Sequence, residues 1–86
     1  MTDAKITMYG TRWCIDCIRA KDFLGRHDVP YTWVDIDRDQ GAADHVRGLN
    51  DGKRIVPTIV LEDGSILVEP TNAELASKLD IRRKAS

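Results

Sequence analysis

The stretch KITMYGTRWCIDC, residues 5–17, holds both cysteines of the chain and begins with a β-prone segment. Its first part, KITMY (residues 5–9), is mostly apolar and is followed by a Gly-Thr pair, which predicts an interior strand that ends there. From Ile15 to about His27, apolar residues recur at helical spacing. Cys14 and Cys17 therefore lie where the first strand passes into the first helix.

Elements of alternating type continue along the rest of the chain. β character resumes at Tyr31 and leads to an acidic end, which predicts a second strand parallel to the first, reached by a right-handed crossover. A second helix is predicted around an apolar stripe, and two β-prone runs meet at a turn that an Asp-Gly step favours. The stripe is Ala42, Val46 and Leu49, the turn contains Asp63 and Gly64, and Thr71 with Glu74 matches a capping box before a last helix. The predicted order is β-α-β-α-β-β-α.

Length and charge restrict what the protein can be. With 86 residues, the chain is expected to form one domain, residues 1–86, which leaves room for only a small active site. It has 13 basic and 14 acidic residues and a formal net charge of -1, so it lacks the positive charge of a nucleic-acid or anionic-membrane binder. The start, MTDAKITMYG, shows no leader-like pattern, and no run of about 18 apolar residues occurs. We expect a cytoplasmic monomer without nucleic-acid or membrane partners.

The C-x-x-C spacing of Cys14 and Cys17 admits three interpretations: a redox pair, half of a metal site, or two small apolar side chains on one helix face. A bridge across so short a loop would restrict the unfolded chain little, so a purely stabilising disulfide is disfavoured. His27 and His45 do not have the spacing from the cysteines that zinc sites use, and no metal site is predicted. Next to a β-α-β unit, the motif is typical of a thioredoxin-like redox site.

Position relative to the first helix assigns a role to each sulfur. Cys14 lies ahead of the first turn, where unpaired backbone N–H groups favour negative charge, and is expected to be the attacking thiolate. Cys17 lies one turn deeper and is expected to release a mixed disulfide by attacking the Cys14 sulfur. Asp16, between them, either opposes a negative charge on Cys14 or points to solvent as an ordinary acidic residue of a first turn.

Several segments together resemble a glutaredoxin over almost the whole chain. They are TMYGTRWCIDC (7–17), KRIVPT (53–58), the Asp63-Gly64 hairpin and the short last helix. Within that superfamily, four segments are most similar to the mycoredoxin-type bacterial branch, whose members use mycothiol where others use glutathione. They are YGTRWCIDC (9–17), VDID (34–37), NDGKRIVPT (50–58) and DGSILVEPTNAEL (63–75). The resemblance implies an α/β thioredoxin-like (glutaredoxin) fold, with a four-stranded mixed sheet flanked by three helices and a cis peptide bond at Val56-Pro57.

The resemblance also implies how a small thiol would bind beside the cysteines. The backbone of Val56 would pair with the extended part of the thiol, and Pro57 would turn the chain towards the first cysteine. Arg54 matches a basic residue of the family and would meet a substrate carboxylate, which suits guanidinium geometry. Thr71 and Asn72 begin the last helix, where backbone N–H groups would meet another carboxylate.

Near the cysteines, the chain departs from members that use glutathione. Those members commonly carry lysine three residues before the first cysteine, where this chain has Thr11 followed by Arg12. A Glu-Pro pair, residues 69–70, replaces the family's paired glycines, and Ile55 replaces the threonine of its TVP step. Arg12 and Trp13 are expected to flank the thiol, with coverage of the sheet end as the alternative for Trp13. These departures argue against glutathione as the natural co-substrate.

The expected function is reduction of mixed disulfides between proteins and a low-molecular-weight thiol, mycothiol or glutathione. This thiol acts as co-substrate, a reductase recycles it, and no permanently bound cofactor is expected. Two alternatives give the cysteines another purpose: a dithiol electron donor to one specific reductase, or a non-enzymatic iron-sulfur carrier in which Cys14 and small thiols bridge a cluster between two chains. Removal of Cys17 separates the first two functions, because only the dithiol donor requires it.

Overall fold

The structure confirms the predicted order of helices and strands. The computed structural model describes residues 5–79, so residues 1–4 and 80–86 of the expected domain lie outside the described part. The elements are β1 (Thr7–Gly10), α1 (Ile15–Arg26), β2 (Thr32–Asp35), α2 (Gln40–Leu49), β3 (Thr58–Val60), β4 (Ile66–Val68) and α3 (Asn72–Lys78).

The four strands form one mixed sheet in the order β2-β1-β3-β4. β1 runs parallel to β2 and antiparallel to β3, and β3 forms an antiparallel hairpin with β4. The hairpin turn holds Gly64 at a positive φ of 87°, which glycine adopts without a steric penalty. The Asp63 carboxylate accepts hydrogen bonds from both the N–H and the hydroxyl of Ser65. The predicted Asp-Gly hairpin is therefore confirmed.

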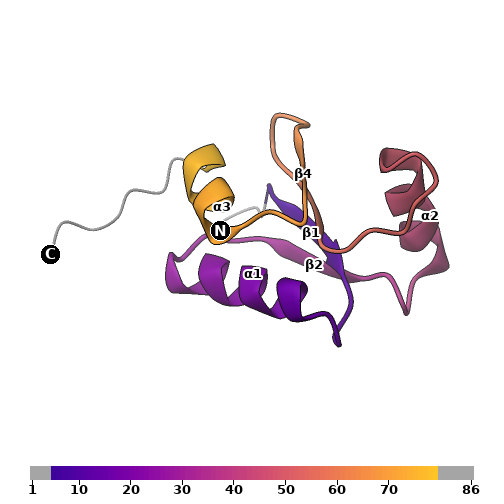
Figure 1. Ribbon diagram of the computed structural model, residues 1–86, viewed down its shortest axis with the longest axis horizontal. Coiled ribbons are helices and arrows are strands. Elements are labelled where there is room, and N and C mark those ends of the chain that lie inside the picture. The colour runs from indigo at the N-terminus through magenta and orange to yellow at the C-terminus, as the bar shows by residue number, and fades with distance from the viewer. Residues whose placement is uncertain (1–4, 80–86) are drawn as a thin grey trace, which may run out of the picture.

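Alternate residues of β1 pack into two clusters on opposite faces of the sheet. Met8 belongs to the cluster under α1 and α3, whereas its neighbour Tyr9 packs against the cluster under α2. The buried members of the first cluster are Met8, Ala20, Leu24, Ile59, Leu61 and Leu75, and those of the second are Ile36, Ala43 and Val46. Burial of each large apolar side chain contributes about 1.5–3 kcal/mol. The helices therefore flank the sheet on both faces, with α2 apart from α1 and α3 (Figure 1).

The apolar stripe of α1 faces this core as its spacing predicts. Cys17, Ala20 and Leu24 are fully buried. The stripe anchors α1 on the sheet with its first turn at the carboxyl end of β1. Because Cys17 belongs to the buried stripe, packing fixes the depth of the second sulfur as well as the position of the helix.

Two strand boundaries differ from those that the sequence predicts. β1 begins at Thr7 and continues through Gly10, which pairs with Asp35 of β2, whereas the sequence predicts a strand that ends before the glycine. The β-prone run VPTIVL starts at Val56 in the sequence, but β3 begins only at Thr58, because Pro57 has no N–H to donate to the sheet. Both boundaries lie near Cys14: β1 ends shortly before it in the chain, and β3 begins shortly after Val56, whose carbonyl faces the Cys14 sulfur.

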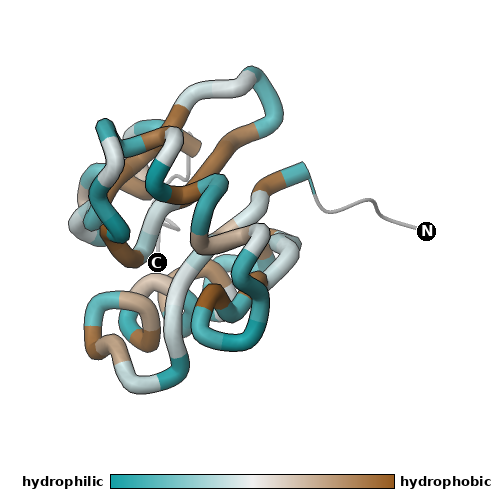
Figure 2. The backbone as a smooth tube through the Cα atoms, turned by 90° about the vertical axis from the view of Figure 1, so that its right-hand side faces the viewer, coloured by the Kyte–Doolittle hydropathy of each residue, from teal (hydrophilic) through white to brown (hydrophobic). Residues whose placement is uncertain are grey.

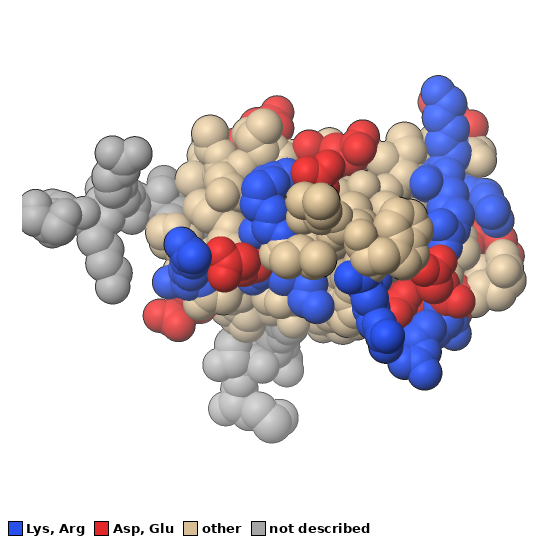
Figure 3. Space-filling view, turned by 60° about the horizontal axis from the view of Figure 1, so that its bottom comes forward, with Lys and Arg blue, Asp and Glu red and all other residues tan. Residues whose placement is uncertain are grey.

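The described surface mixes apolar and charged side chains. None of the helices within residues 5–79 is long and apolar enough to cross a membrane, and hydrophobic stretches in Figure 2 are short and interrupted by hydrophilic ones. On the face in Figure 3, Lys and Arg lie interspersed with Asp and Glu around uncharged areas. Three apolar side chains around the start of α1 are largely exposed: Trp13, Ile15 and Ile18. They make the approach to Cys14 partly apolar.

Candidate active site

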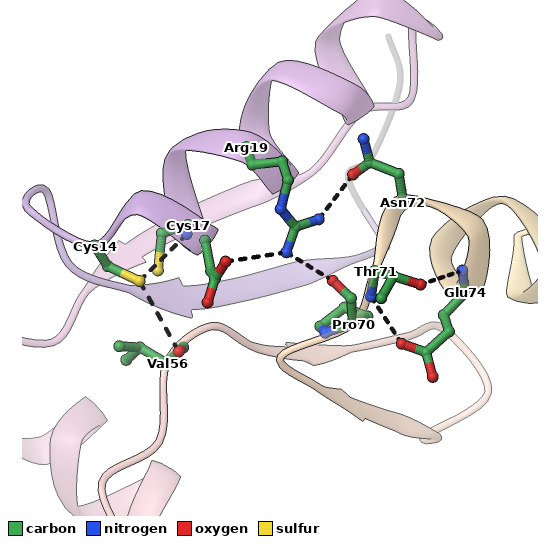
Figure 4. Close-up of polar contacts among 9 residues, drawn as sticks. Cys14, Cys17, Arg19, Val56, Pro70, Thr71, Asn72 and Glu74 are labelled. Atoms are coloured by element: carbon green, nitrogen blue, oxygen red, sulfur yellow. Dashed lines mark hydrogen bonds and ion pairs between the residues drawn. The ribbon is translucent and has the colours of Figure 1, made fainter.

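Cys14 caps the start of α1 with its sulfur. The residue has an extended backbone, with φ -81° and ψ 119°, and its Sγ accepts a hydrogen bond from the Cys17 N–H at 3.3 Å (Figure 4). A helix start leaves about four such N–H groups without an intrahelical partner. Cys14 is partly exposed, whereas Cys17, one turn further along, is fully buried, and both are free thiols. The two predicted sulfurs thus meet at one helix turn, with only the first in contact with solvent.

The segment before β3 approaches Cys14 from the opposite side. The Cys14 thiol is directed at the carbonyl oxygen of Val56, with 3.9 Å between sulfur and oxygen (Figure 4). The bond between Val56 and the buried Pro57 is cis, as the family resemblance implies. The Thr58 hydroxyl fixes this segment by donating a hydrogen bond to the Ile55 carbonyl at 2.7 Å. The structure therefore brings the expected Val56-Pro57 step to the thiol.

Gly10, at the end of β1, leaves the space that the Cys17 sulfur occupies. A Cβ atom on residue 10 would lie 2.6 Å from the Cys17 Sγ and 2.8 Å from the Trp33 ring. Atoms in a close-packed interior do not approach so closely, so Cys17 is buried here only because residue 10 lacks a side chain. The one signal of this in the sequence is a glycine at the end of a strand, which often marks close approach by another group.

Burial keeps the Cys17 thiol protonated. Burial raises the pKa of Cys17 from 9.0 to about 12, and the hydrogen bond with Cys14 and the nearby Asp16 charge act in the same direction. A hydrogen bond with the Thr11 backbone lowers the pKa in opposition. The Thr11 hydroxyl is itself buried, with no hydrogen-bond partner among residues 5–79. At neutral pH, Cys17 is therefore a neutral thiol beneath Cys14.

This difference predicts selective alkylation of the native protein. Iodoacetamide at pH 7 to 9 is expected to modify Cys14 and to leave Cys17 free, because alkylation needs an accessible thiolate. The Cys17 thiolate forms in the folded protein only as the pH approaches about 12, whereas the same thiol in an unfolded chain ionises near its ordinary pKa of 9.0. Because folding raises this pKa, the contribution of the neutral Cys17 thiol to stability is complete below pH 9.0 and is lost as the pH rises towards about 12.

The measurement is peptide mass mapping after timed alkylation. A sample unfolded in guanidinium chloride serves as the control, in which both cysteines are expected to react. Equal labelling of Cys14 and Cys17 in the native protein would show that the second sulfur is not protected by burial.

Asp37, in the turn after β2, connects the segments on both sides of Cys14. Its Oδ2 accepts a hydrogen bond from the Trp13 Nε1–H at 2.7 Å, and its Oδ1 pairs with the Arg54 guanidinium. Asp35 holds the turn, because its carboxylate accepts the Asp37 N–H at 3.0 Å. The hydrogen bonds from Trp13 and then Arg54 lower the pKa of Asp37, so it is ionised at neutral pH. Sequence reasoning missed this residue and identified only the acidic end of a strand.

An open cavity adjoins the Trp13 and Asp37 pair. Its volume is about 340 Å³, and its lining residues are Arg12, Trp13, Asp35, Asp37 and Arg38. Trp13 is 67% exposed although its N–H is bonded to Asp37, so the indole ring is held by its polar edge and its faces remain accessible. Arg12 and Trp13, both expected to flank a small thiol, line this cavity, and Arg54 is joined to it through Asp37.

Arg19 ties α1 to the segment that begins α3. Its guanidinium donates hydrogen bonds to the Asn72 Oδ1 at 2.8 Å and to the Pro70 carbonyl oxygen at 3.0 Å (Figure 4). It also pairs with the Asp16 carboxylate at 3.3 Å. Of the two interpretations of Asp16, this pairing favours an acidic residue on the helix surface, bound to a cation one turn ahead.

Thr71 caps α3 with a complete capping box. Its hydroxyl accepts the Glu74 N–H at 3.0 Å, and its own N–H donates to the Glu74 carboxylate at 2.7 Å. The predicted cap is therefore confirmed. The Thr71 N–H and the Asn72 side chain, at the place expected to meet a substrate carboxylate, are thus already bound by groups of the protein.

Both histidines take part in aromatic packing. The His45 ring lies 5.5 Å from the Tyr9 ring and the His27 ring 4.5 Å from the Phe23 ring, measured between ring centroids. Among the side chains of residues 5–79, no three of His, Cys, Asp or Glu gather in an arrangement that could hold a metal ion. The structure thus gives each histidine a packing role.

The comparisons with known proteins agree with the geometry. The Glutaredoxin family model matches residues 6–66. A Mycobacterium tuberculosis protein named as a glutaredoxin is 40% identical over 79 residues, 92% of this chain and 94% of the relative. Mycoredoxin 1 of Corynebacterium glutamicum is 36% identical over 78 residues, 90% of this chain and 95% of the relative. A solved mutant of the thioredoxin-like protein BC3987 has a TM-score of 0.81 and 27% identity, and the match covers 91% of this chain and 97% of that chain. The chain therefore belongs to the glutaredoxin family, shares its thioredoxin-like fold, and is a thiol-disulfide oxidoreductase.

Proposed function

We propose that this oxidoreductase reduces mixed disulfides between proteins and a low-molecular-weight thiol, with Cys14 as the attacking sulfur and Cys17 as the resolving sulfur. The observation that supports these roles is the contrast between the two residues. Cys14 is partly exposed and accepts a helix N–H, whereas Cys17 is fully buried, with its pKa raised to about 12. The thiolate is the nucleophile in disulfide exchange, and a helix N-terminus favours negative charge.

In the first step, the Cys14 thiolate attacks the sulfur of the small thiol in the mixed disulfide. A disulfide bond forms between Cys14 and the small thiol, and the bond between the small thiol and the client protein breaks. The client leaves as a thiolate and takes up a proton from water. The client cysteine is thereby reduced, and Cys14 is oxidised to the mixed disulfide with the small thiol. One disulfide breaks as another forms, so no outside oxidant or reductant is needed.

The second step removes the adduct from Cys14 by one of two routes. A second molecule of the small thiol, as its thiolate, attacks the adduct, which forms an oxidised dimer of the small thiol and frees Cys14. Alternatively, Cys17 attacks the Cys14 sulfur and its proton passes to the departing small thiol, which forms the intramolecular disulfide and releases the small thiol. Two further molecules of the small thiol then reduce that disulfide and leave as their oxidised dimer. In the small-thiol route Cys14 leaves as a thiolate at the helix N-terminus, where its negative charge is stabilised.

The proposed thiol site extends to both sides of Cys14. Its residues are Arg12, Trp13, Arg54, Val56, Pro57, Thr71 and Asn72. The position of the Val56 carbonyl, 3.9 Å from the Cys14 sulfur, supports backbone pairing between Val56 and the extended part of the thiol. The cavity beside Trp13 provides room for the remainder of the molecule.

Mycothiol is the proposed small thiol, in preference to glutathione. One support is the similarity to mycoredoxin 1 of Corynebacterium glutamicum. Another is that Arg54 and the Thr71 N–H, two groups suited to bind carboxylates, are already paired with Asp37 and Glu74. Glutathione carries two carboxylates, whereas mycothiol presents the hydroxyl groups of a glucosamine and an inositol.

The test is mass spectrometry of the Cys17→Ser protein after exposure to an equimolar mixture of oxidised mycothiol, glutathione and bacillithiol. We expect one adduct, on Cys14, with the mass of mycothiol, because Cys17 is no longer present to resolve it. The matched control is Cys14→Ser, which is expected to remain free of adduct. Adducts on residue 17 of that control, or none on Cys14 of the first variant, would contradict the assigned roles, and a glutathione adduct would contradict the choice of thiol.

The same variant distinguishes the dithiol electron donor. If the protein removes adducts by the small-thiol route, Cys17→Ser retains most of its activity on a peptide mixed disulfide when excess small thiol is present. If it serves as a dithiol donor, Cys17→Ser loses turnover altogether. We propose the first outcome, because Cys14 alone contacts solvent.

A further inference from the structure

We propose that Asp37 is a specificity-determining residue of the thiol site, which selects a thiol with a neutral, hydroxyl-rich body over one that carries carboxylates. This inference rests on the proposed function, because it concerns the small thiol that Cys14 takes up. It assigns the selection to a residue outside the C-x-x-C segment and outside the segment around Val56.

Asp37 is already paired with Arg54, the cation that a substrate carboxylate is expected to meet. The guanidinium is the cation on the Val56 side of Cys14, and its partner is the Asp37 Oδ1. An incoming carboxylate can bind Arg54 only by displacing this internal one. A carboxylate tethered in the same chain acts at an effective concentration of about millimolar or more, so weakly held carboxylate ligands compete poorly.

Displacement of Asp37 from Arg54 would also release Trp13. The other oxygen of Asp37, Oδ2, holds the Trp13 N–H at 2.7 Å, so a ligand that pulls Asp37 away from Arg54 disturbs both bonds. Asp35 fixes Asp37 from behind by accepting its backbone N–H at 3.0 Å. Asp37 is therefore held by contacts with three residues, Trp13, Asp35 and Arg54. An incoming carboxylate would have to break some of these contacts before it could bind the guanidinium.

The cavity beside Trp13 and Asp37 suits hydroxyl groups. Its lining combines two guanidinium groups, two carboxylates and one indole, so it offers both donors and acceptors with little net charge. A hydroxyl both donates and accepts hydrogen bonds and fits such a lining. A carboxylate only accepts, and its attraction to Arg12 and Arg38 is offset by repulsion from Asp35 and Asp37. The exposed faces of the Trp13 ring provide an apolar surface on which the CH groups of a sugar ring can pack.

The experiment compares kcat/KM for two peptide mixed disulfides in the full-length protein. One carries glutathione, and the other carries the N-acetylcysteinyl amide of glucosamine, which has hydroxyl groups and no carboxylate. The test variant Asp37→Asn keeps the size of the side chain but removes its charge. It is expected to shift the ratio of kcat/KM towards glutathione by about tenfold, equivalent to about 1.4 kcal/mol, because Arg54 becomes free to bind a carboxylate.

Two further variants show whether the shift comes from this site. Asp44→Asn in α2 removes the same charge and also breaks a pair with an arginine, Arg47, but does not line the cavity; it is expected to leave the ratio unchanged. The double variant Asp37→Asn with Arg54→Gln is expected to lose the shift, because the freed guanidinium is absent. Thermal unfolding midpoints verify that each variant is folded.

The outcomes separate this inference from the proposed function. If the wild-type protein turns over neither mixed disulfide, the proposed function fails. If it turns over both but the ratio in Asp37→Asn does not exceed that in Asp44→Asn, or the shift persists without Arg54, the role of Asp37 fails and the proposed function stands.

Discussion

Replacement of Cys14 with serine is expected to lower the rate of mixed-disulfide reduction by at least about a thousandfold, as loss of a nucleophile typically does. A serine hydroxyl does not ionise near neutral pH and does not attack a disulfide sulfur. The helix N–H that now reaches the Cys14 sulfur at 3.3 Å would meet an oxygen that cannot form the disulfide adduct. Cys17 cannot substitute for it, because it is fully buried and its pKa is about 12.

The measurement is steady-state reduction of a peptide mixed disulfide by excess small thiol, with release of the peptide thiol followed by mass spectrometry. Cys17→Ser is the matched control, since it makes the same chemical change one helix turn away. Retention by Cys14→Ser of more than a few per cent of the wild-type rate would show that another group attacks the disulfide.

Much of the fold follows from local features of the sequence. The buried stripe of α1 at Cys17, Ala20 and Leu24, the Asp63-Gly64 hairpin and the Thr71 capping box each depend on residues within one element, and the structure confirms all three. The position of the C-x-x-C segment at a strand-to-helix junction is likewise local. Such features can be predicted because propensity, periodicity and capping act over a few residues.

The parts of the site that depend on distant pairing could not be predicted from local features, and the approach of Val56-Pro57 to Cys14 is expected only from the family resemblance. Asp37 lies 24 residues from Trp13 and 17 from Arg54, and only the fold brings the three together. Arg19 meets Asn72 across 53 residues of chain in the same way. The position of a charged side chain in the sequence does not indicate which residue it pairs with. The sequence therefore indicates Arg54 as a cation available to a substrate, whereas the structure shows it paired with Asp37.

Replacement of Gly10 with alanine is expected to destabilise the protein by about 1–3 kcal/mol, the usual range for overpacking of a core. The added Cβ would meet the Cys17 Sγ at 2.6 Å and the Trp33 ring at 2.8 Å. Cys17 is fully buried and Trp33 packs against the core cluster under α1 and α3, which limits how far either group can shift. In a domain of this size, each kcal/mol lowers the unfolding midpoint by about 4–8 °C. The measurement is thermal and urea unfolding of the reduced protein.

The control for this substitution is Gly48→Ala in α2. Apart from its chain neighbours and the backbone of its own helix, an added Cβ there would have no atom within 4 Å. This variant is expected to stabilise the protein by about 0.5–1 kcal/mol, because alanine favours a helix more than glycine does. Combining Gly10→Ala with Cys17→Ala removes one of the two clashing groups, so the double variant should lose less stability than the sum of the single variants. Full additivity would mean that the Cys17 sulfur is not what residue 10 makes room for, and the burial of the second sulfur would then need a different cause.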